Sequence, residues 1–137
     1  MNEGVQIVKK DTKAFDFDAT HCPDLFPPLA VLASFAQGES IIKGVSRLIH
    51  KESNRAHSIK SELSKMGAKI SIVGDDMLIQ GIEKAKSGLI DPHGDHRIAM
   101  ACAIMALKAE EATTIKNPEV VRKSFPDFFE YLEKIVS

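Results

Sequence analysis

The feature of this sequence that most constrains its fold is an internal repeat with a period of 71 residues. Asp24 precedes an apolar helical pattern, and Asp95, which lies 71 positions later, precedes a second one. The tripeptide KES at 51–53 returns at the same offset as RKS at 122–124, and each precedes an amphipathic pattern. Because helix type, order and spacing agree, the chain is predicted to hold two copies of one folding unit.

The first copy is predicted to have the order β-α-β-α-β-β. Apolar runs that are typical of strands occur at 15–19, 40–45, 69–74 and 77–81. An apolar helix is predicted at 23–38 and an amphipathic helix at 52–67, and each is closed by a glycine. Gly74, Asp75 and Asp76 indicate a hairpin turn between the last two strands.

The second copy is shorter than the first. Its predicted elements are a strand at 88–90, a helix at 95–110, a strand at 112–117 and a last helix within 118–136. We therefore expect a single domain, with unit one at about 15–82 and a truncated unit two at about 87–137. The alternating run VQIVKK at 5–10 predicts one more strand. Either this strand fills the gap in unit two, or the chain is a piece of a larger protein.

The first helix of each unit is apolar nearly all round, whereas the second helix of each unit has a polar face. A helix that is apolar on every side has to be surrounded by protein. We therefore expect the segments 28–36 and 98–107 at the centre of the domain, with the sheets packed outside them. The predicted fold class is α/β (α+β), built from repeated β-α-β-α-β-β units.

The composition excludes several partners. Charged residues make up 27% of the chain and the formal net charge is −1, so no global field favours nucleic acid or an anionic membrane. No apolar run approaches the roughly 20 residues that cross a bilayer, and no leader pattern opens the chain. Cys22 and Cys102 lie far apart without a CxxC motif, and we interpret them as reduced residues of a cytoplasmic protein.

Ionisable residues gather at the predicted helix starts. They are Asp24 at the first, Lys51, Glu52 and Arg55 at the second, Asp95, His96 and Arg97 at the third, and Arg122 and Lys123 at the fourth. A helix N-terminus exposes unpaired N–H groups and a partial positive charge, so cations placed there destabilise the helix unless an anion binds. The pattern therefore predicts an anion site with proton-transfer groups beside it.

Simpler roles compete for some of these residues. Asp24 and Asp95 also suit helix N-caps, and Glu52 suits a first turn, where the helix dipole favours an acid. A metal site on His93, Asp95 and His96 is not expected, because adjacent helix positions point about 100° apart and no HxxxH or CxxC motif supports them. The sequence also contains neither a GxxxxGK[ST] nor a GxGxxG motif, so no nucleotide cofactor is expected.

Four stretches carry a resemblance to a known enzyme family. They are CPDLFPPLAVLA at 22–33, HKESNR at 50–55, GDHRIAMA at 94–101 and KSFPDFFEYL at 123–132. In order and spacing they resemble the 5-enolpyruvylshikimate-3-phosphate (EPSP) synthases, or 3-phosphoshikimate 1-carboxyvinyltransferases. The resemblance implies units of the enolpyruvyl transferase type around buried parallel helices, and no metal or other cofactor. It also implies a longer parent enzyme, of which this chain is the C-terminal third.

The resemblance implies an activity as well. The family transfers the enolpyruvyl group of phosphoenolpyruvate to the 5-hydroxyl of shikimate 3-phosphate and releases phosphate, a step of aromatic amino acid biosynthesis in the shikimate pathway. By resemblance, Asp24 lies by the shikimate hydroxyl as a candidate base, and Glu52 serves the methylene carbon of phosphoenolpyruvate. Lys51 lies between the two substrates. The implied phosphoenolpyruvate clamp consists of Arg55, Arg97 and Lys123, with His96 beside it.

Two positions depart from the family pattern. Asn54 stands where the family usually has Asp, and Ile49 stands where it often has Arg, which weakens one contact toward shikimate 3-phosphate. The chain alone is expected to be inactive, because the missing N-terminal domain of the same polypeptide holds most of that substrate. Two alternatives stay open at this point: another carboxyvinyl transferase, and a non-catalytic module that binds anions on the same fold.

Overall fold

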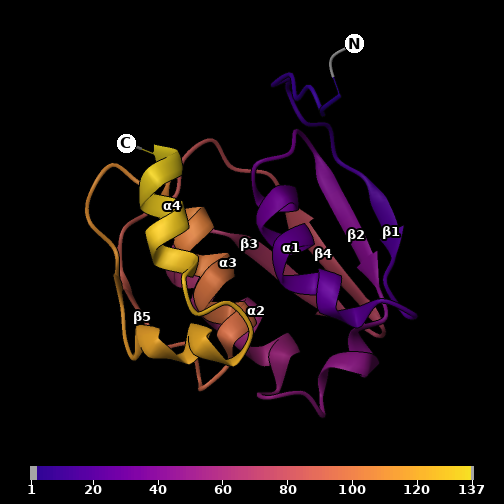
Figure 1. Ribbon diagram of the computed structural model, residues 1–137. Helices are drawn as coiled ribbons and strands as arrows, with labels where there is room; N and C mark the ends of the chain where they lie inside the picture. The colour runs from indigo at the N-terminus through magenta and orange to yellow at the C-terminus, as the bar shows by residue number, and fades with distance from the viewer. Residues whose placement is uncertain (1–2, 137) are drawn as a thin grey trace.

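The computed structural model describes residues 3–136 and arranges the elements in the predicted order (Figure 1). Unit one contains β1 (Asp16–Asp18), α1 (Phe26–Ser34), β2 (Glu39–Lys43), α2 (Arg55–Lys65), β3 (Lys69–Val73) and β4 (Asp76–Gln80). Unit two contains β5 (Leu89–Ile90), α3 (His96–Ala106), β6 (Thr114–Ile115) and α4 (Phe128–Val136). Short 3-10 helices precede α1, α2 and α4, namely η1 (Pro23–Leu25), η2 (Val45–Leu48) and η3 (Pro118–Lys123).

Strand pairing repeats from one unit to the next. β1 pairs with β2 in parallel, and β5 pairs with β6 in parallel. Opposed residues are 25 positions apart in both pairs, for example Asp16 with Ile41 and Leu89 with Thr114. An isolated parallel bridge extends each pair, at Lys13–Gln37 and at Ala85–Ala109. The repeat in the sequence is therefore also a repeat of strand register.

The sheet of unit one has four strands in the order β1-β2-β4-β3. The predicted hairpin is confirmed, because β3 and β4 pair antiparallel and are joined through Gly74, which has a φ of +60°. A left-handed φ favours glycine, since a β-carbon there would crowd the backbone. The β5–β6 sheet of unit two has only the two strands that the truncated repeat predicts.

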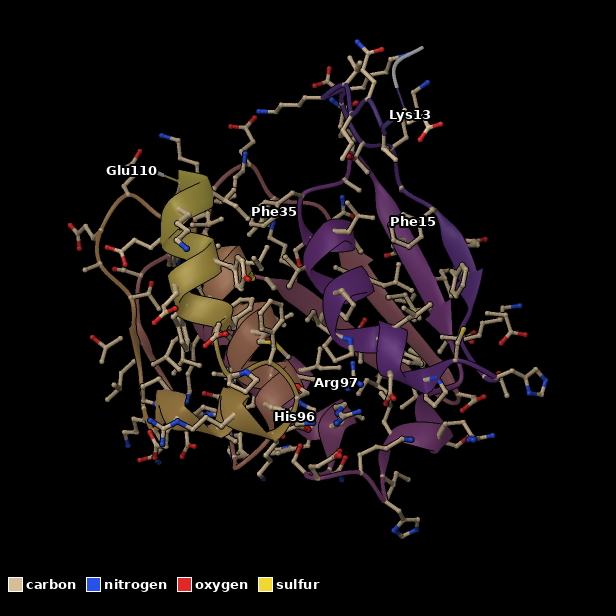
Figure 2. All side chains as sticks on the ribbon, in the orientation of Figure 1. Lys13, Phe15, Phe35, His96, Arg97 and Glu110 are labelled. Carbon is tan, nitrogen blue, oxygen red and sulfur yellow. The ribbon has the colours of Figure 1, made fainter. Side chains whose placement is uncertain are left out.

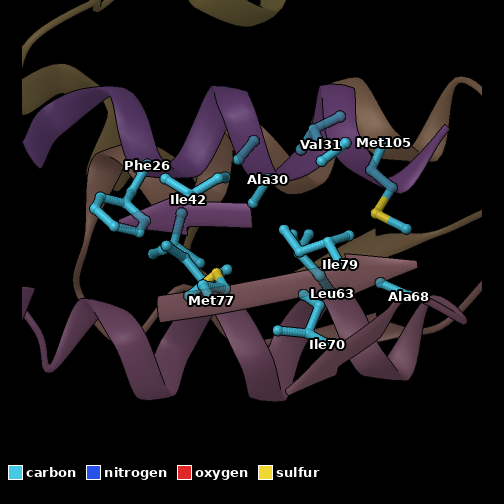
Figure 3. Packing of buried hydrophobic residues seen from close by; sticks show 14 of the residues in the cluster. Phe26, Ala30, Val31, Ile42, Leu63, Ala68, Ile70, Met77, Ile79 and Met105 are labelled. Carbon is cyan, nitrogen blue, oxygen red and sulfur yellow. The ribbon is translucent and has the colours of Figure 1, made fainter. Parts of the chain in front are cut away.

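The main core lies between α1, α2 and the four-stranded sheet. α1 packs on β2 and β4, while α2 packs on β3 and α3. Figure 3 shows Phe26 and Ala30 of α1 above Ile42 of the sheet, with Leu63 of α2 and Ile70 of β3 filling the same cluster. Each large apolar side chain buried in this way contributes about 1.5–3 kcal/mol.

The two central helices are not enclosed on every side within residues 3–136. α1 and α3 pack against each other, but a mostly apolar groove of about 580 Å³ remains along them. Leu32 of α1 is 47% exposed there, Ile104 of α3 is 41% exposed, and Leu107, the residue after α3, is 49% exposed. The two helices were expected to be enclosed at the centre of the domain. This is confirmed only for the sides of α1 and α3 that pack against each other and against the rest of the domain. Their shared groove stays open, because the described residues supply no further element to cover it. Across the same residues, no helix combines the length and apolar character needed to cross a membrane.

The prediction of a strand at 5–10 is wrong. These residues, all of which the structure describes, adopt no regular structure, and Val5 and Ile7 are each 89% exposed. They therefore do not complete the β5–β6 sheet. An alternating pattern shows that a segment is able to pair, but a strand forms only beside an edge that offers free N–H and C=O groups.

The two aspartates at equivalent repeat positions differ in capping. Asp95 is the N-cap of α3, and its carboxylate accepts a hydrogen bond from the N–H of Arg97 at 3.0 Å. Asp24 lies inside η1, and neither η1 nor α1 has a side-chain cap, so the predicted capping role of Asp24 is wrong. The first turn of α1 holds Pro27 and Pro28, which have no N–H groups for a carboxylate to bind.

Candidate active site

The starts of α1, α2 and α3 lie on one side of the domain, next to η3. Figure 1 shows these ends together, and Figure 2 places His96 and Arg97 at this end of α3, with Phe35 at the far end of α1. The contacts agree, because Arg55 at the start of α2 bonds to both Asp24 and Asp95. The common face that the repeat predicts is therefore present, and it gathers every predicted site residue.

Arg55 is the centre of this face. Its guanidinium is fully buried and donates hydrogen bonds to Asp24 at 2.9 Å, to Glu52 at 2.5 Å, and to Asp95 at 2.8 and 3.2 Å. Burial alone would lower the pKa of the guanidinium, but the bonds and charges of Asp95, Glu52 and Asp24 raise it above its ordinary value. These charge-assisted bonds offset the loss of hydration. Arg55 therefore joins the acids to one another.

Asp95 does more than cap α3. Its side chain is fully buried, and it also accepts a hydrogen bond from the hydroxyl of Ser53 at 2.9 Å. Burial alone would raise the pKa of Asp95, but the hydrogen bonds and charge of Arg55, together with Ser53, hold it below the ordinary value. The ionised carboxylate thus ties the start of α3 to the start of α2. Removing one partner from a buried ion pair of this kind costs about 3–5 kcal/mol.

A second contact of this face joins the partly exposed Glu52 to the buried His96. The Glu52 side chain is 44% exposed, and its Oε1 lies 3.7 Å from Nε2 of His96. The backbone N–H of Glu52 lowers the pKa of its own carboxyl group, burial acts in the opposite direction, and Arg55 lowers the pKa further, so the net value is below the ordinary one. The other ring nitrogen of His96, Nδ1, is hydrogen-bonded to the hydroxyl of Ser124. This bond fixes the ring with Nε2 toward Glu52.

Lys51, Arg97 and Lys123 border the acids and keep contact with solvent. The Arg97 guanidinium lies 3.5 Å from Asp24 and its side chain is 37% exposed, while the Lys51 ammonium lies 3.9 Å from Asp24. The exposed Lys123 donates to the backbone C=O of Gly94 at 2.6 Å. Cations with spare donors beside the N-terminus of a helix are the groups that an anion with more than one charged oxygen would need.

Glu52, Asp95 and His96 also have the donor atoms of a metal site, all within 4.8 Å of one another. Both oxygens of Asp95 already accept hydrogen bonds from Arg55. A divalent ion bound there would lie against a buried guanidinium, and like charges in a desolvated site repel strongly. We therefore keep the metal-free site as our prediction.

Sequence reasoning missed two serines of this face. Ser53 bonds to Asp95 and Ser124 bonds to His96, so each orients a neighbouring site residue. Their signal was present in the sequence, since Ser53 and Ser124 are the serines of KES and RKS and lie 71 residues apart. The repeat therefore places one hydroxyl at each of two equivalent positions, Ser53 just before α2 and Ser124 at the end of η3.

Solved structures first define the class of fold. An enolpyruvyl transferase, NikO from Streptomyces tendae, superposes with a TM-score of 0.71 at 20% identity, over 93% of this chain and 29% of that protein. At this identity the likeness shows the fold alone. EPSP synthase from Acinetobacter baumannii superposes with a TM-score of 0.73 at 33% identity, over 80% of this chain and 26% of that one. The α/β units therefore have the architecture of the enolpyruvyl transferases.

Sequence comparison identifies the particular family. The family model described as EPSP synthase (3-phosphoshikimate 1-carboxyvinyltransferase) matches residues 2–132, and the chain belongs to this family. The 3-phosphoshikimate 1-carboxyvinyltransferase of Clostridium acetobutylicum is 42% identical over 127 residues, which are 93% of this chain and 30% of that protein. The enzyme of the same name from Syntrophobacter fumaroxidans is 43% identical over 138 residues and is covered to 32%. The chain thus spans about 30% of the length of such relatives.

Proposed function

We propose that this chain supplies one face of an active site that transfers the enolpyruvyl group of phosphoenolpyruvate to the 5-hydroxyl of shikimate 3-phosphate and releases phosphate. One observation carries the proposal: in a member of the EPSP synthase family, two partly exposed acids, Asp24 and Glu52, meet around the buried Arg55 beside solvent-accessible cations. The reaction uses both kinds of group, because it moves protons and binds two anionic substrates.

Asp24 and Glu52 divide the proton transfers in this proposal. In the addition step, Asp24 takes the proton of the attacking hydroxyl, whose oxygen bonds to the carbon that bears the phosphate, while the methylene carbon gains a proton from Glu52. In the elimination step, Glu52 takes a proton back from the same terminal carbon. The carbon–carbon double bond then forms again as the C–O bond to phosphate breaks. The lowered pKa of Glu52 favours the carboxylate form that accepts the proton in the elimination step, and Nε2 of His96 lies 3.7 Å from this carboxylate.

The cations hold the substrates. Lys51, Arg97 and Lys123 offer accessible donors, and the N-terminus of α3 adds backbone N–H groups. Arg55 contributes to the phosphoenolpyruvate clamp by exchanging a carboxylate partner for a substrate anion. Asp24, which is 51% exposed, is the partner best placed to leave.

The remainder of the polypeptide completes the site in this proposal. The chain covers about 30% of its relatives, and the apolar groove beside Leu32 and Ile104 matches the kind of surface that buries against further protein. We propose that other segments of the same polypeptide cover this groove and that the N-terminal domain holds most of shikimate 3-phosphate. We place the enzyme in the cytoplasm, in keeping with its free cysteines Cys22 and Cys102.

The test is an assay of phosphate release by the full-length polypeptide with phosphoenolpyruvate and shikimate 3-phosphate, and separately with UDP-N-acetylglucosamine as acceptor. We expect turnover with shikimate 3-phosphate only, and turnover with the other acceptor alone would show a different carboxyvinyl transferase. The isolated 137-residue chain should show no turnover and should bind phosphoenolpyruvate at millimolar concentrations or more weakly, because an open, hydrated half-site screens its charges. Micromolar binding by the isolated chain would favour a non-catalytic anion-binding module.

A further inference from the structure

Glu62 is a buried carboxylate that the proposed chemistry does not use. It lies on α2, and its side chain is 0% exposed. Its oxygens accept hydrogen bonds from the ammonium of Lys65 at 2.7 Å, from the backbone N–H of Asp91 at 2.8 Å, and from Nε2 of His93 at 3.1 Å. Burial alone would raise the pKa of Glu62, but these donors lower it to about 2. Two of the donors come from the loop at 91–95, which leads into α3.

This loop has a conformation that its own sequence only partly supports. His93 has a φ of 54° and Gly94 a φ of 68°, and the left-handed region is unfavourable for a residue with a β-carbon such as His93. Inside the loop, the carboxylate of Asp91 accepts from the N–H of His93 at 2.9 Å. Glu62 adds support from outside the loop, since it binds the backbone at Asp91 and the side chain at His93.

The loop sets the position of three features of the proposed site. The C=O of Gly94 accepts the hydrogen bond of Lys123. Asp95, the next residue, caps α3 and holds Arg55. His96 and Arg97 follow as the first residues of α3. A shift of this loop would therefore move the anion-binding groups and the buried ion pair together.

We propose that Glu62 is a positioning residue of the site, which fixes the 91–95 loop and thereby the place where α3 begins. The kinetic consequence rests on the proposed function, whereas the structural consequence does not. Groups that bind a reacting substrate have to be held closely, and a misplacement of about 1 Å can reduce turnover about 100-fold.

The repeat provides a matched control for Glu62. Glu133 lies 71 residues later, on α4, and is exposed. A second control is Lys65, whose side chain is 45% exposed and which contacts Glu62 without touching the loop donors. Glu133→Gln reports the loss of one carboxylate charge at the equivalent position, and Lys65→Met reports the loss of the ion pair alone.

The experiment compares Glu62→Gln, Glu133→Gln, Lys65→Met and His93→Ala in the full-length polypeptide. Hydrogen exchange followed by mass spectrometry measures the amides of residues 89–97 and, as an internal reference, those of β2–β4. We expect Glu62→Gln to accelerate exchange at 91–97 by about tenfold while the reference strands keep their protection. It should also lower kcat by roughly 10- to 100-fold. Both controls should stay within about twofold of the unmodified protein.

His93→Ala keeps the inference testable if Glu62→Gln does not fold. It removes the hydrogen bond between the His93 ring and Glu62, together with the edge contact of that ring with His57, and it leaves the bond from Asp91 to Glu62 in place. Exchange at 91–97 should therefore accelerate by a smaller factor. Unchanged exchange there in every folded Glu62 and His93 variant would overturn the positioning role. An equal effect of Lys65→Met would also overturn it. The ion pair between Lys65 and Glu62 within α2, and not the contacts of Glu62 with the loop, would then account for the change in exchange. If the unmodified polypeptide has no transferase activity, the proposed function fails, but the exchange data still decide the role of Glu62.

Discussion

The two units have the same order of strands and helices but different side chains at equivalent positions of the repeat. Glu52 in unit one corresponds to Lys123 in unit two, and Arg55 corresponds to Pro126. Glu52 joins the acids around Arg55, whereas Lys123 binds the C=O of Gly94 and remains exposed. In the function proposed above, this equivalent pair divides the work: Glu52 transfers protons, and Lys123 offers its ammonium group to a substrate anion.

The same division separates the aspartates at the first helix of each unit. Asp24 is 51% exposed, lies in η1 and contacts Arg97 and Lys51 from unit two and unit one. Asp95 is fully buried and serves as the N-cap of α3 and as a partner of Arg55. One aspartate is therefore accessible from solvent, and its repeat partner is part of the buried framework.

Neutralising the charge at position 52 and, separately, at position 123 is the sharpest test of this division. In the full-length polypeptide, Glu52→Gln should lower kcat by about 100- to 10,000-fold with little change in substrate binding, because it keeps the shape and removes proton transfer. Lys123→Gln should instead raise the Michaelis constant for phosphoenolpyruvate. Steady-state kinetics separates the two, and an equal loss of kcat in both variants would refute the division of labour.

Removing Arg55, whose guanidinium bonds to acids of both units, should destabilise the whole domain. Arg55→Met leaves the buried Asp95 without its guanidinium, so the free energy of unfolding should fall by about 3–5 kcal/mol. Arg47→Met is the control, since Arg47 is exposed in η2 and should change the same quantity by less than about 0.5 kcal/mol. Urea unfolding of both variants measures the difference, and a stable Arg55→Met protein would show that Arg55 is not a framework residue.

Acidification should remove the contribution that the buried carboxylate of Glu62 makes to stability. The pKa of Glu62 is lowered from 4.5 to about 2, so its contribution is present above pH 4.5 and is lost as pH falls toward 2. This contribution amounts to up to about 3 kcal/mol of unfolding free energy. Glu62→Gln should flatten the profile between these pH values, while Glu133→Gln should parallel the unmodified protein. Parallel profiles for all three proteins would contradict the shift.

The smallest expected effect concerns the anion-binding group of unit two. Arg97→Ala should raise the Michaelis constant for phosphoenolpyruvate about 10- to 100-fold, which corresponds to the roughly 1.5–3 kcal/mol of a charge-assisted hydrogen bond. The value of kcat should change less, since the contact is made in the ground state as well. Arg122→Ala, a neighbouring exposed cation on η3, is the control. An unchanged Michaelis constant would make Arg97 a structural partner of Asp24.

The element order and most of the site residues followed from local pattern. Helix periodicity, the glycine stops and the 71-residue offset predicted α1 to α4 and the shared face that holds Asp24, Glu52, Asp95 and Lys123. The prediction of a strand at 5–10, which rested on alternation, was wrong. An alternating pattern carries no information about whether a partner edge exists. The serines 53 and 124 were visible as a repeated pair, but only their contacts reveal which neighbours they orient.

The sequence by itself determined the repeat, the family resemblance and the cluster of charged groups at helix starts, since these depend on residues close along the chain. The tertiary structure decided which charges face one another: Arg55 lies 40 residues from Asp95 and 31 from Asp24 in sequence, yet bonds to both. It also decided that Glu62 supports a loop 29 residues away. Such partners are set by how α2 packs against α3, and a buried charge takes whichever partners that packing brings within hydrogen-bonding distance.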